Sequence, residues 1–183
     1  MILESIRREH GYMYRILGLL ENDLEELKSE KPINYSLVRE IVDYLSVFAD
    51  ENHHPKEDLL YQYYLENFGF TEQVNKLLVD HSSLSEFTSA FSETVDMILN
   101  DAVIPQDIFI THLEAFICRV KTHLEMEDRE VLPFLDKALA PNDWQKIELL
   151  WQGDKNDPLF GDTIADQYKQ LAQRLKLMSK ESI

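Results

Sequence analysis

Four long stretches with a helical spacing of apolar residues constrain the fold of this chain more than any other feature. In each stretch, apolar side chains recur every three or four residues, which places them on one face of a helix. Short breaks at 32–34, 68–71 and 100–105 separate the stretches. The chain has only 5 Gly and 6 Pro, so few other breaks are available. The predicted helices lie at about 2–29, 35–66, 72–100 and 106–138.

Short connections between long amphipathic helices predict an all-α fold, an antiparallel up-down four-helix bundle. We divide the chain into this bundle, 1–140, and a short C-terminal helical extension, 141–183, that packs on it. Pro55 and Pro133 fall inside predicted helices, and each is expected to kink its helix because proline removes a backbone hydrogen bond. The helices of the extension are predicted at about 143–151 and 162–179.

Charge and cysteine content narrow the classes of function. A net charge of −16 argues against partners such as nucleic acid or an anionic membrane, because phosphate groups would repel the chain. The single cysteine, Cys118, excludes an internal disulfide and fits a reducing compartment. It lies roughly 140° around the helix from His123, so it is not expected to share a site with that residue. Without an apolar membrane span, and with charges early in the chain, we expect a cytoplasmic protein.

Two helical segments carry a histidine followed four residues later by a glutamate. The pairs are His53 with Glu57 and His123 with Glu127. At this spacing both side chains lie on one face of a helix, with their Cβ atoms about 5–6 Å apart. An imidazole and a carboxylate directed at one point form half of a transition-metal site. A second acid follows each pair directly in the sequence.

Two further histidines, His10 and His81, lie within the apolar stripes of the first and third helices. Either one alone is more often a hydrogen-bonded core residue than a metal ligand. A rise of 1.5 Å per residue, however, places all the candidate side chains about 12–22 Å from the same end of an up-down bundle. The predicted metal site therefore contains six residues from four helices: His10, His53, Glu57, His81, His123 and Glu127.

The sequence gives less specific predictions for the two remaining histidines, His54 and His112. His54 could pair with Asp58 at the same four-residue spacing, but it would then point about 100° away from His53. We therefore prefer His53 as the ligand and place His54 at the rim of the site or beside the ligands, and whether His54 binds instead of His53 is left open. His112 lies about three turns from His123 on the same helical face, which is too far for a shared ion. We interpret it as a structural core histidine.

Four histidines and two glutamates are a suitable ligand set for two metal ions. If both carboxylates bridge, each ion receives two nitrogens and two oxygens, and up to about two positions of an octahedron stay open. Mixed histidine and carboxylate ligation with open positions is typical of iron sites that react with oxygen. No thiolate favours structural zinc. Iron is therefore preferred over zinc or manganese.

The motifs resemble those of the hemerythrin-like HHE cation-binding domain family over about 3–138. The resemblance is carried by His-His-Pro-Lys-Glu-Asp at 53–58, by His-x-x-x-Glu-Asp-x-x-Val-Leu-Pro at 123–133, and by the single histidines 10 and 81. The segment 157–161 is also similar to tails of bacterial members. The resemblance implies a non-haem di-iron centre. It implies terminal histidine ligands and bridging glutamates, namely His10, His53, His81 and His123 with Glu57 and Glu127.

The sequence departs from oxygen-carrying hemerythrins at two places. Those proteins have two histidines one turn apart on the third helix, whereas Leu77 and Ser85 flank His81 here. Their last helix separates histidine from a bridging aspartate by five residues, whereas Glu127 follows His123 by four. The resemblance therefore favours members linked to iron handling, to nitric oxide or peroxide stress, or to oxygen sensing.

These features predict a cytoplasmic non-haem di-iron protein that binds or senses O₂, NO or peroxide, or handles iron. The two irons would be bridged by carboxylates, with an oxo bridge as a further option. One alternative is a di-iron oxidase, peroxidase or NO-reducing enzyme. Another is a metal storage or structural metal-binding module. The expected partner is a small diatomic molecule or peroxide, and homodimer formation is left open.

Overall fold

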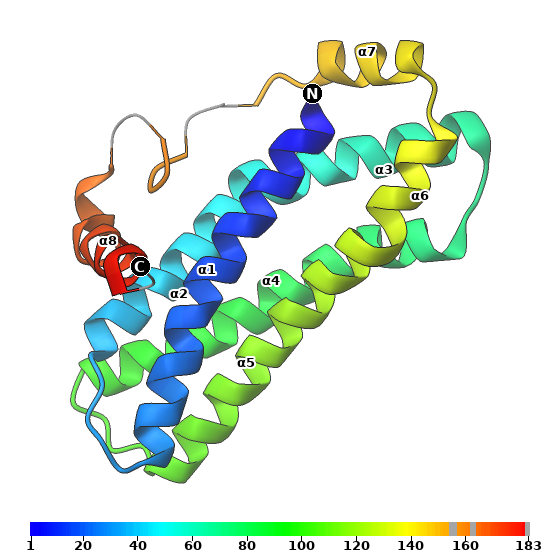
Figure 1. Ribbon diagram of the computed structural model, residues 1–183. Coiled ribbons are helices and arrows are strands. Elements are labelled where there is room, and N and C mark those ends of the chain that lie inside the picture. Colours follow the sequence, from blue (N-terminus) through cyan, green and yellow to red (C-terminus); the bar gives the residue numbers. More distant parts are fainter. Residues whose placement is uncertain (154–156, 162–163, 182–183) are drawn as a thin grey trace.

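The protein is all-α in the computed structural model of Figure 1, which describes residues 1–153, 157–161 and 164–181. Among these residues there is no strand, and the all-α fold class is confirmed. The α-helices are α1 (Ile2–Lys28), α2 (Tyr35–Phe48), α3 (His54–Phe68), α4 (Glu72–Leu99), α5 (Gln106–Met126), α6 (Leu132–Ala138), α7 (Pro141–Leu150) and α8 (Lys169–Glu181).

The long helices form the predicted antiparallel bundle. Its four members are α1, the continuous path α2–α3, α4, and the continuous path α5–α6 (Figure 1). Helix α1 packs against α5, and α2 packs against α4. Gly69 ends α3 with a φ of +100°, a conformation that glycine adopts without strain. The helix boundaries therefore follow the glycine and proline breaks of the sequence closely.

Two prolines lie within long helices without breaking them. A π-helical turn, Ala49–His53, precedes Pro55, and a second one, Glu127–Val131, precedes Pro133. The backbone N–H of His54 bonds to Ala49 O, five residues back. Each wide turn adds one residue and places its proline at the start of the next α-helical segment, where a missing N–H is tolerated. Single π-turns of this kind occur frequently at functional sites.

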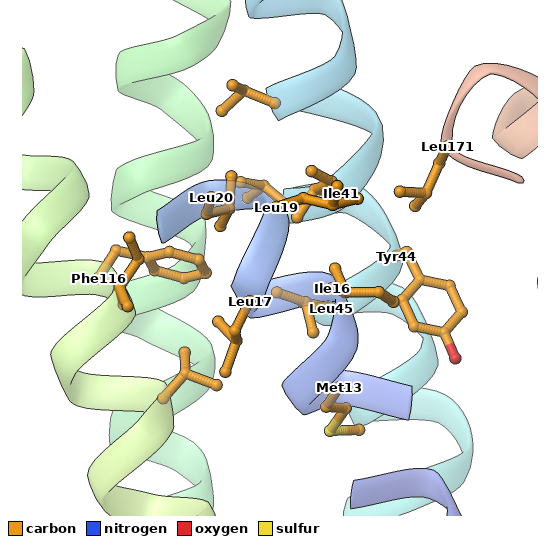
Figure 2. Close-up of a cluster of buried hydrophobic side chains, with 14 of the residues drawn as sticks. Met13, Ile16, Leu17, Leu19, Leu20, Ile41, Tyr44, Leu45, Phe116 and Leu171 are labelled. Atoms are coloured by element: carbon orange, nitrogen blue, oxygen red, sulfur yellow. The ribbon is translucent and has the colours of Figure 1, made fainter. Parts of the chain in front are cut away.

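The apolar core consists of two clusters with a polar layer between them. On α1, Ile6 belongs to one cluster and Met13 to the other, and His10 lies between them. On the second bundle helix, Phe48 and Leu60 belong to opposite clusters. Figure 2 shows the larger cluster, in which side chains of α1, α2 and α5 interdigitate. Burial of these side chains fixes the four helices on both sides of the polar layer.

The C-terminal helices contact the bundle at different places. Helix α7 contacts α1 and α3 at one end of the bundle, and α8 contacts α2 at its side (Figure 1). The Tyr44 hydroxyl donates a hydrogen bond to Asp157 Oδ2 at 2.8 Å, which attaches the connecting segment to α2. The last helix begins later than predicted: a 3₁₀ turn, Asp166–Tyr168, precedes α8, and 162–163 lie outside the described residues. The domain boundary at 140 stays a prediction.

No helix in the described part of the chain is long and apolar enough to cross a membrane.

Candidate metal centre

The six predicted ligand side chains meet in the polar layer. They come from all four bundle helices, and each of the six residues is at most 5% exposed. The ε2 nitrogens of His10 and His53 are 3.0 Å apart. The structure thus brings together every residue that the sequence assigns to the site, although their role as ligands stays a prediction.

Glu57 lies between the two halves of this cluster. Its Oε1 is 3.1 Å from His10 Nε2 and 3.4 Å from His53 Nε2. Its Oε2 faces the other side, 3.5 Å from His81 Nε2. One oxygen of the carboxylate is therefore directed to each half of the centre, which is the arrangement that a bridging carboxylate requires.

Glu127 has a comparable position. Its Oε2 is 3.3 Å from His123 Nε2 and 3.5 Å from His10 Nε2, and its Oε1 is 3.5 Å from His81 Nε2. The buried Tyr61 hydroxyl donates a hydrogen bond to Glu127 Oε1 at 2.8 Å. This hydrogen bond restricts the rotation of the carboxylate and keeps Oε2 directed toward the histidines.

An acid on a neighbouring helix holds the outer nitrogen of each of these four histidines. The Nδ1 atoms lie 2.6–3.1 Å from a carboxylate oxygen, so each imidazole directs its Nε2 inward. Carboxylate–histidine pairs of this kind fix the tautomer of metal-binding histidines and increase their basicity. We call the four acids the acid ring. Its pairs are Glu9 with His53, Asp58 with His81, Asp80 with His123, and Asp128 with His10.

The carboxylates strongly perturb two of the histidines. Burial lowers the pKa of His10, but hydrogen bonds with Asp128 and Glu57 outweigh this effect and raise the pKa to about 10. Burial likewise opposes protonation of His81, but Asp58 and Glu127 raise its pKa to about 10. The metal-free centre therefore holds protons at positions where a cation would replace them.

The two glutamates are perturbed in opposite directions. Burial and repulsion from Glu127 raise the pKa of Glu57. Burial opposes ionisation of Glu127 as well, but the charge of His123 and the nearby imidazoles of His81 and His10 lower its pKa to about 2. Two carboxyl groups that repel each other in a buried site need positive charge nearby, and a metal ion supplies it.

Unpartnered polar atoms test whether the residues fit a metal. Four buried atoms of the cluster lack any hydrogen-bond partner: Glu57 Oε2, His81 Nε2, His123 Nε2 and Glu127 Oε2. Buried polar atoms without partners are rare in native proteins because desolvation is costly. All four atoms are of the types that bind transition metals, and all four lie in one layer. The donor set therefore fits a metal centre.

The structure excludes one of the two positions predicted for His54. The residue is not at the rim: it is only 7% exposed, and its ring stacks on His81 with the centroids 4.3 Å apart. A π-helical turn, Ala49–His53, comes directly before it, and both His53 and His54 are buried. Two groups of four residues could each hold one metal ion, because the ligand atoms within each group lie within 4.8 Å of one another. The groups are His10, His53, Glu57 and Glu127, and His54, Glu57, His81 and His123.

The prediction that His112 is a core histidine is wrong. It lies on the exposed side of α5, because Phe109, Leu113 and Phe116 form the buried face at that level. Cys118 is also exposed and free, which agrees with its exclusion from the site.

The sequence-based prediction missed the residues that surround the ligands. Glu9 and Asp80 were not considered, and no role was assigned to Tyr61 or Lys56. One signal was available: each acid of the acid ring is the direct sequence neighbour of a predicted ligand. Only the acids that follow Glu57 and Glu127 were noticed, and their partners on other helices could not be deduced from spacing within one helix.

The fold and site together define a class of protein, an all-α bundle with a buried histidine and glutamate centre for cations. Comparison with protein families gives a match over residues 1–135 to the family described as Hemerythrin HHE cation binding domain. The chain therefore belongs to the hemerythrin HHE cation-binding family. Comparisons with curated proteins and with solved structures give no significant match.

Proposed function

We propose that this protein binds two iron ions in the polar layer and uses them to bind or sense O₂, NO or peroxide. The observation that carries the proposal is the set of unpartnered Nε2 and carboxylate atoms that converge in the centre of the bundle. Iron held by nitrogen and carboxylate ligands with open positions supplies the binding and redox chemistry for such molecules.

The residues of the chain would have distinct tasks. Glu57 and Glu127 would connect the two ions, since each carboxylate has oxygens directed to both halves of the centre. The acid ring would keep each imidazole in the tautomer that presents Nε2. The two apolar clusters on either side would exclude water from the layer, which strengthens every electrostatic contact within it.

Metal analysis of the purified protein tests this proposal. We expect about two irons per chain after anaerobic loading with ferrous iron, and near-ultraviolet absorption of the oxidised protein that dithionite bleaches. Adding O₂, NO and peroxide separately to the reduced protein then identifies the ligand by the spectral change. A sustained consumption of reductant would instead indicate an enzyme.

Two variants distinguish a specific loss of iron binding from a general effect on folding. Glu127→Ala should lower the iron content to less than about one per chain, because it removes a carboxylate that faces both halves of the site. Glu130→Ala, an exposed acid three residues on, is the matched control and should retain the full content. Equal losses in both variants, or a wild-type protein that takes up only zinc, would refute the proposal.

A further inference from the structure

We propose that the surface pocket between α7 and the N-terminal part of α1 is a binding site for a small aromatic monocarboxylate. Helix α7 contacts α1 and α3 at this end of the bundle (Figure 1). The pocket has a volume of about 770 Å³, which is within the range of small-molecule sites in proteins. The six predicted metal ligands do not line it, so a ligand there would occupy a site of its own. Its lining includes Ile2, Ser5, Arg8, Lys56, Glu148 and Trp151.

Lys56 supplies a buried positive charge to this pocket. The residue is 5% exposed, and its ammonium pairs with Glu9 Oε1 and lies 3.4 Å from Ser5 Oγ. An ammonium group has three N–H donors, and these two contacts use two of them. The third donor is available to a ligand. It is a strong binding group for an anion, because the surrounding protein screens its charge less than water does.

Arg8 supplies a second positive charge. Its Nη2 donates a hydrogen bond to Ser5 Oγ at 3.3 Å, and it forms no ion pair with the acids in the described part of the chain. Arg8 and Lys56 together oppose the single negative charge of Glu9, so one positive charge is in excess. This excess matches a carboxylate. A doubly charged phosphate fits less well, since the net charge of −16 repels additional anionic charge.

Two further acids of the lining are exposed to solvent. The side chains of Glu4 and Glu148 are 72% and 44% exposed, respectively. Glu148 Oε1 also accepts the backbone N–H of Ile2 at 3.0 Å. Water and salt screen exposed charges strongly, so these acids repel an anion in the pocket less than buried acids would. The buried charge of Lys56, together with Arg8, therefore determines the sign of the ligand.

The Trp151 ring gives the pocket an aromatic wall. The Lys56 ammonium is 5.5 Å from the centre of this ring, so the positive charge and the aromatic surface are adjacent. A Cβ atom at position 153 would lie 2.1 Å from Trp151 Cζ2, so Gly153 allows the main chain to pack closely against the indole. This packing holds the ring beside the pocket. A planar aromatic body in contact with Trp151 would keep a directly attached carboxylate within reach of Lys56.

An NMR titration of the full-length protein, free of paramagnetic metal, with 2-naphthoate tests the proposal. The chain has 2 Trp, so its indole N–H groups give two signals, and the variant Trp151→Phe assigns them. We expect a saturable shift of the Trp151 signal with a dissociation constant of about 1 mM or lower, as the size of this ligand predicts. The signal of Trp144, which is buried and does not line the pocket, should move little.

Analogues and variants then test the recognition chemistry. Cyclohexanecarboxylate, 2-naphthyl phosphate and 2-naphthylmethylamine should each bind more weakly than 2-naphthoate. Arg8→Gln, a change at an exposed side chain, should weaken 2-naphthoate binding about 10-fold, because a charged hydrogen-bond donor is lost. Arg7→Gln is the matched control: Arg7 is exposed and pairs with Asp136 away from the pocket, so the affinity should not change.

Several results would overturn the proposal. They are the absence of a saturable shift of the Trp151 signal up to about 10 mM ligand, which is about ten times the expected dissociation constant, equal losses of affinity in Arg8→Gln and Arg7→Gln, and tighter binding of the phosphate or the amine than of 2-naphthoate. Equal binding of cyclohexanecarboxylate would refute the aromatic part of the assignment. None of these results depends on metal, so they leave the proposed iron centre unaffected.

Discussion

The buried ion pair between Lys56 and Glu9 is expected to stabilise the polar layer, and replacing one partner tests this directly. Lys56 is 5% exposed and Glu9 is 6% exposed. The Lys56 ammonium pairs with Glu9 Oε1, lies 3.4 Å from Ser5 Oγ and is 5.5 Å from the centre of the Trp151 ring. Glu9 Oε2 accepts the hydrogen bond from His53 Nδ1 at 2.9 Å. Lys56 thus neutralises the acid that orients a predicted ligand.

Replacing Lys56 by Met removes the charge and keeps most of the side-chain volume. Loss of one partner of a buried pair typically costs 3–5 kcal/mol, because the other charge stays buried. Glu9 keeps two hydrogen bonds, from Ser5 and His53, and both side chains border a surface pocket of about 770 Å³ that can admit water. We therefore expect the lower end of this range, a loss of about 3 kcal/mol in the free energy of unfolding of Lys56→Met.

Urea denaturation of the metal-free protein at pH 7.5 measures this loss. In the double variant Lys56→Met/Glu9→Gln the buried charge is gone, so it should be more stable than the sum of the single losses predicts by at least about 1 kcal/mol. Lys121→Met is the control, because Lys121 pairs with Glu21 at the half-exposed surface and its loss should cost less than about 1 kcal/mol. Losses below 1 kcal/mol for Lys56→Met, or strict additivity in the cycle, would contradict the reasoning.

Three further predictions concern the centre and the core. Tyr61→Phe should lower the stability of the metal-free protein by about 1–3 kcal/mol in urea denaturation, because a buried carboxylate loses its hydroxyl donor. Metal affinity should rise steeply between pH 6 and 8, because His10 and His81, each with a pKa of about 10, must together release about two protons when a metal binds. Calorimetry in buffers of different ionisation enthalpy measures the number of protons released. Burial raises the pKa of Asp23 to about 6, so the folded state holds a proton that the unfolded state releases, and stability should fall as pH rises from about 4 to 6. Asp23→Asn should remove this fall and raise the free energy of unfolding at pH 8 by about 1 kcal/mol, a value reduced to allow for the partial exposure of the side chain. A variant whose stability has the same pH profile as the wild type would contradict this prediction.

The architecture could be predicted from the sequence because it depends on local signals. Helical periodicity fixes which face of each helix is buried, and glycine or proline fixes the breaks, so α1 ends within one residue of its predicted end. The common level of His10 and His81 with the two His-x-x-x-Glu pairs followed from helix rise and antiparallel order alone.

The details of the site depend on features that regular helix geometry does not contain. The burial of His54 follows a π-helical turn before Pro55, whose one extra residue changes the register of the helix faces in a way that regular periodicity does not predict. The prediction for His112 was wrong for a related reason. It extended the buried face over three turns from His123 and did not consider that apolar neighbours such as Leu113 occupy the buried positions there. Contacts between helices, such as Glu9 with His53, require the relative rotation of two helices, which the periodicity of either helix alone does not give.

The acid ring connects the fold to the chemistry of the centre. Each bundle helix supplies an acid to the histidine of the next helix in the chain, and Asp128 of the fourth closes the ring on His10 of the first. Every imidazole is therefore oriented by a helix other than its own, so a small shift of one helix moves the acceptor of its neighbour's histidine. The same contacts place negative charge around the centre before any metal enters, which lowers the cost of bringing cations into a buried layer. A bundle that is closed in this way holds its predicted ligands in place through tertiary structure, and the stability of the fold and the affinity for metal should change together in variants of the acid ring.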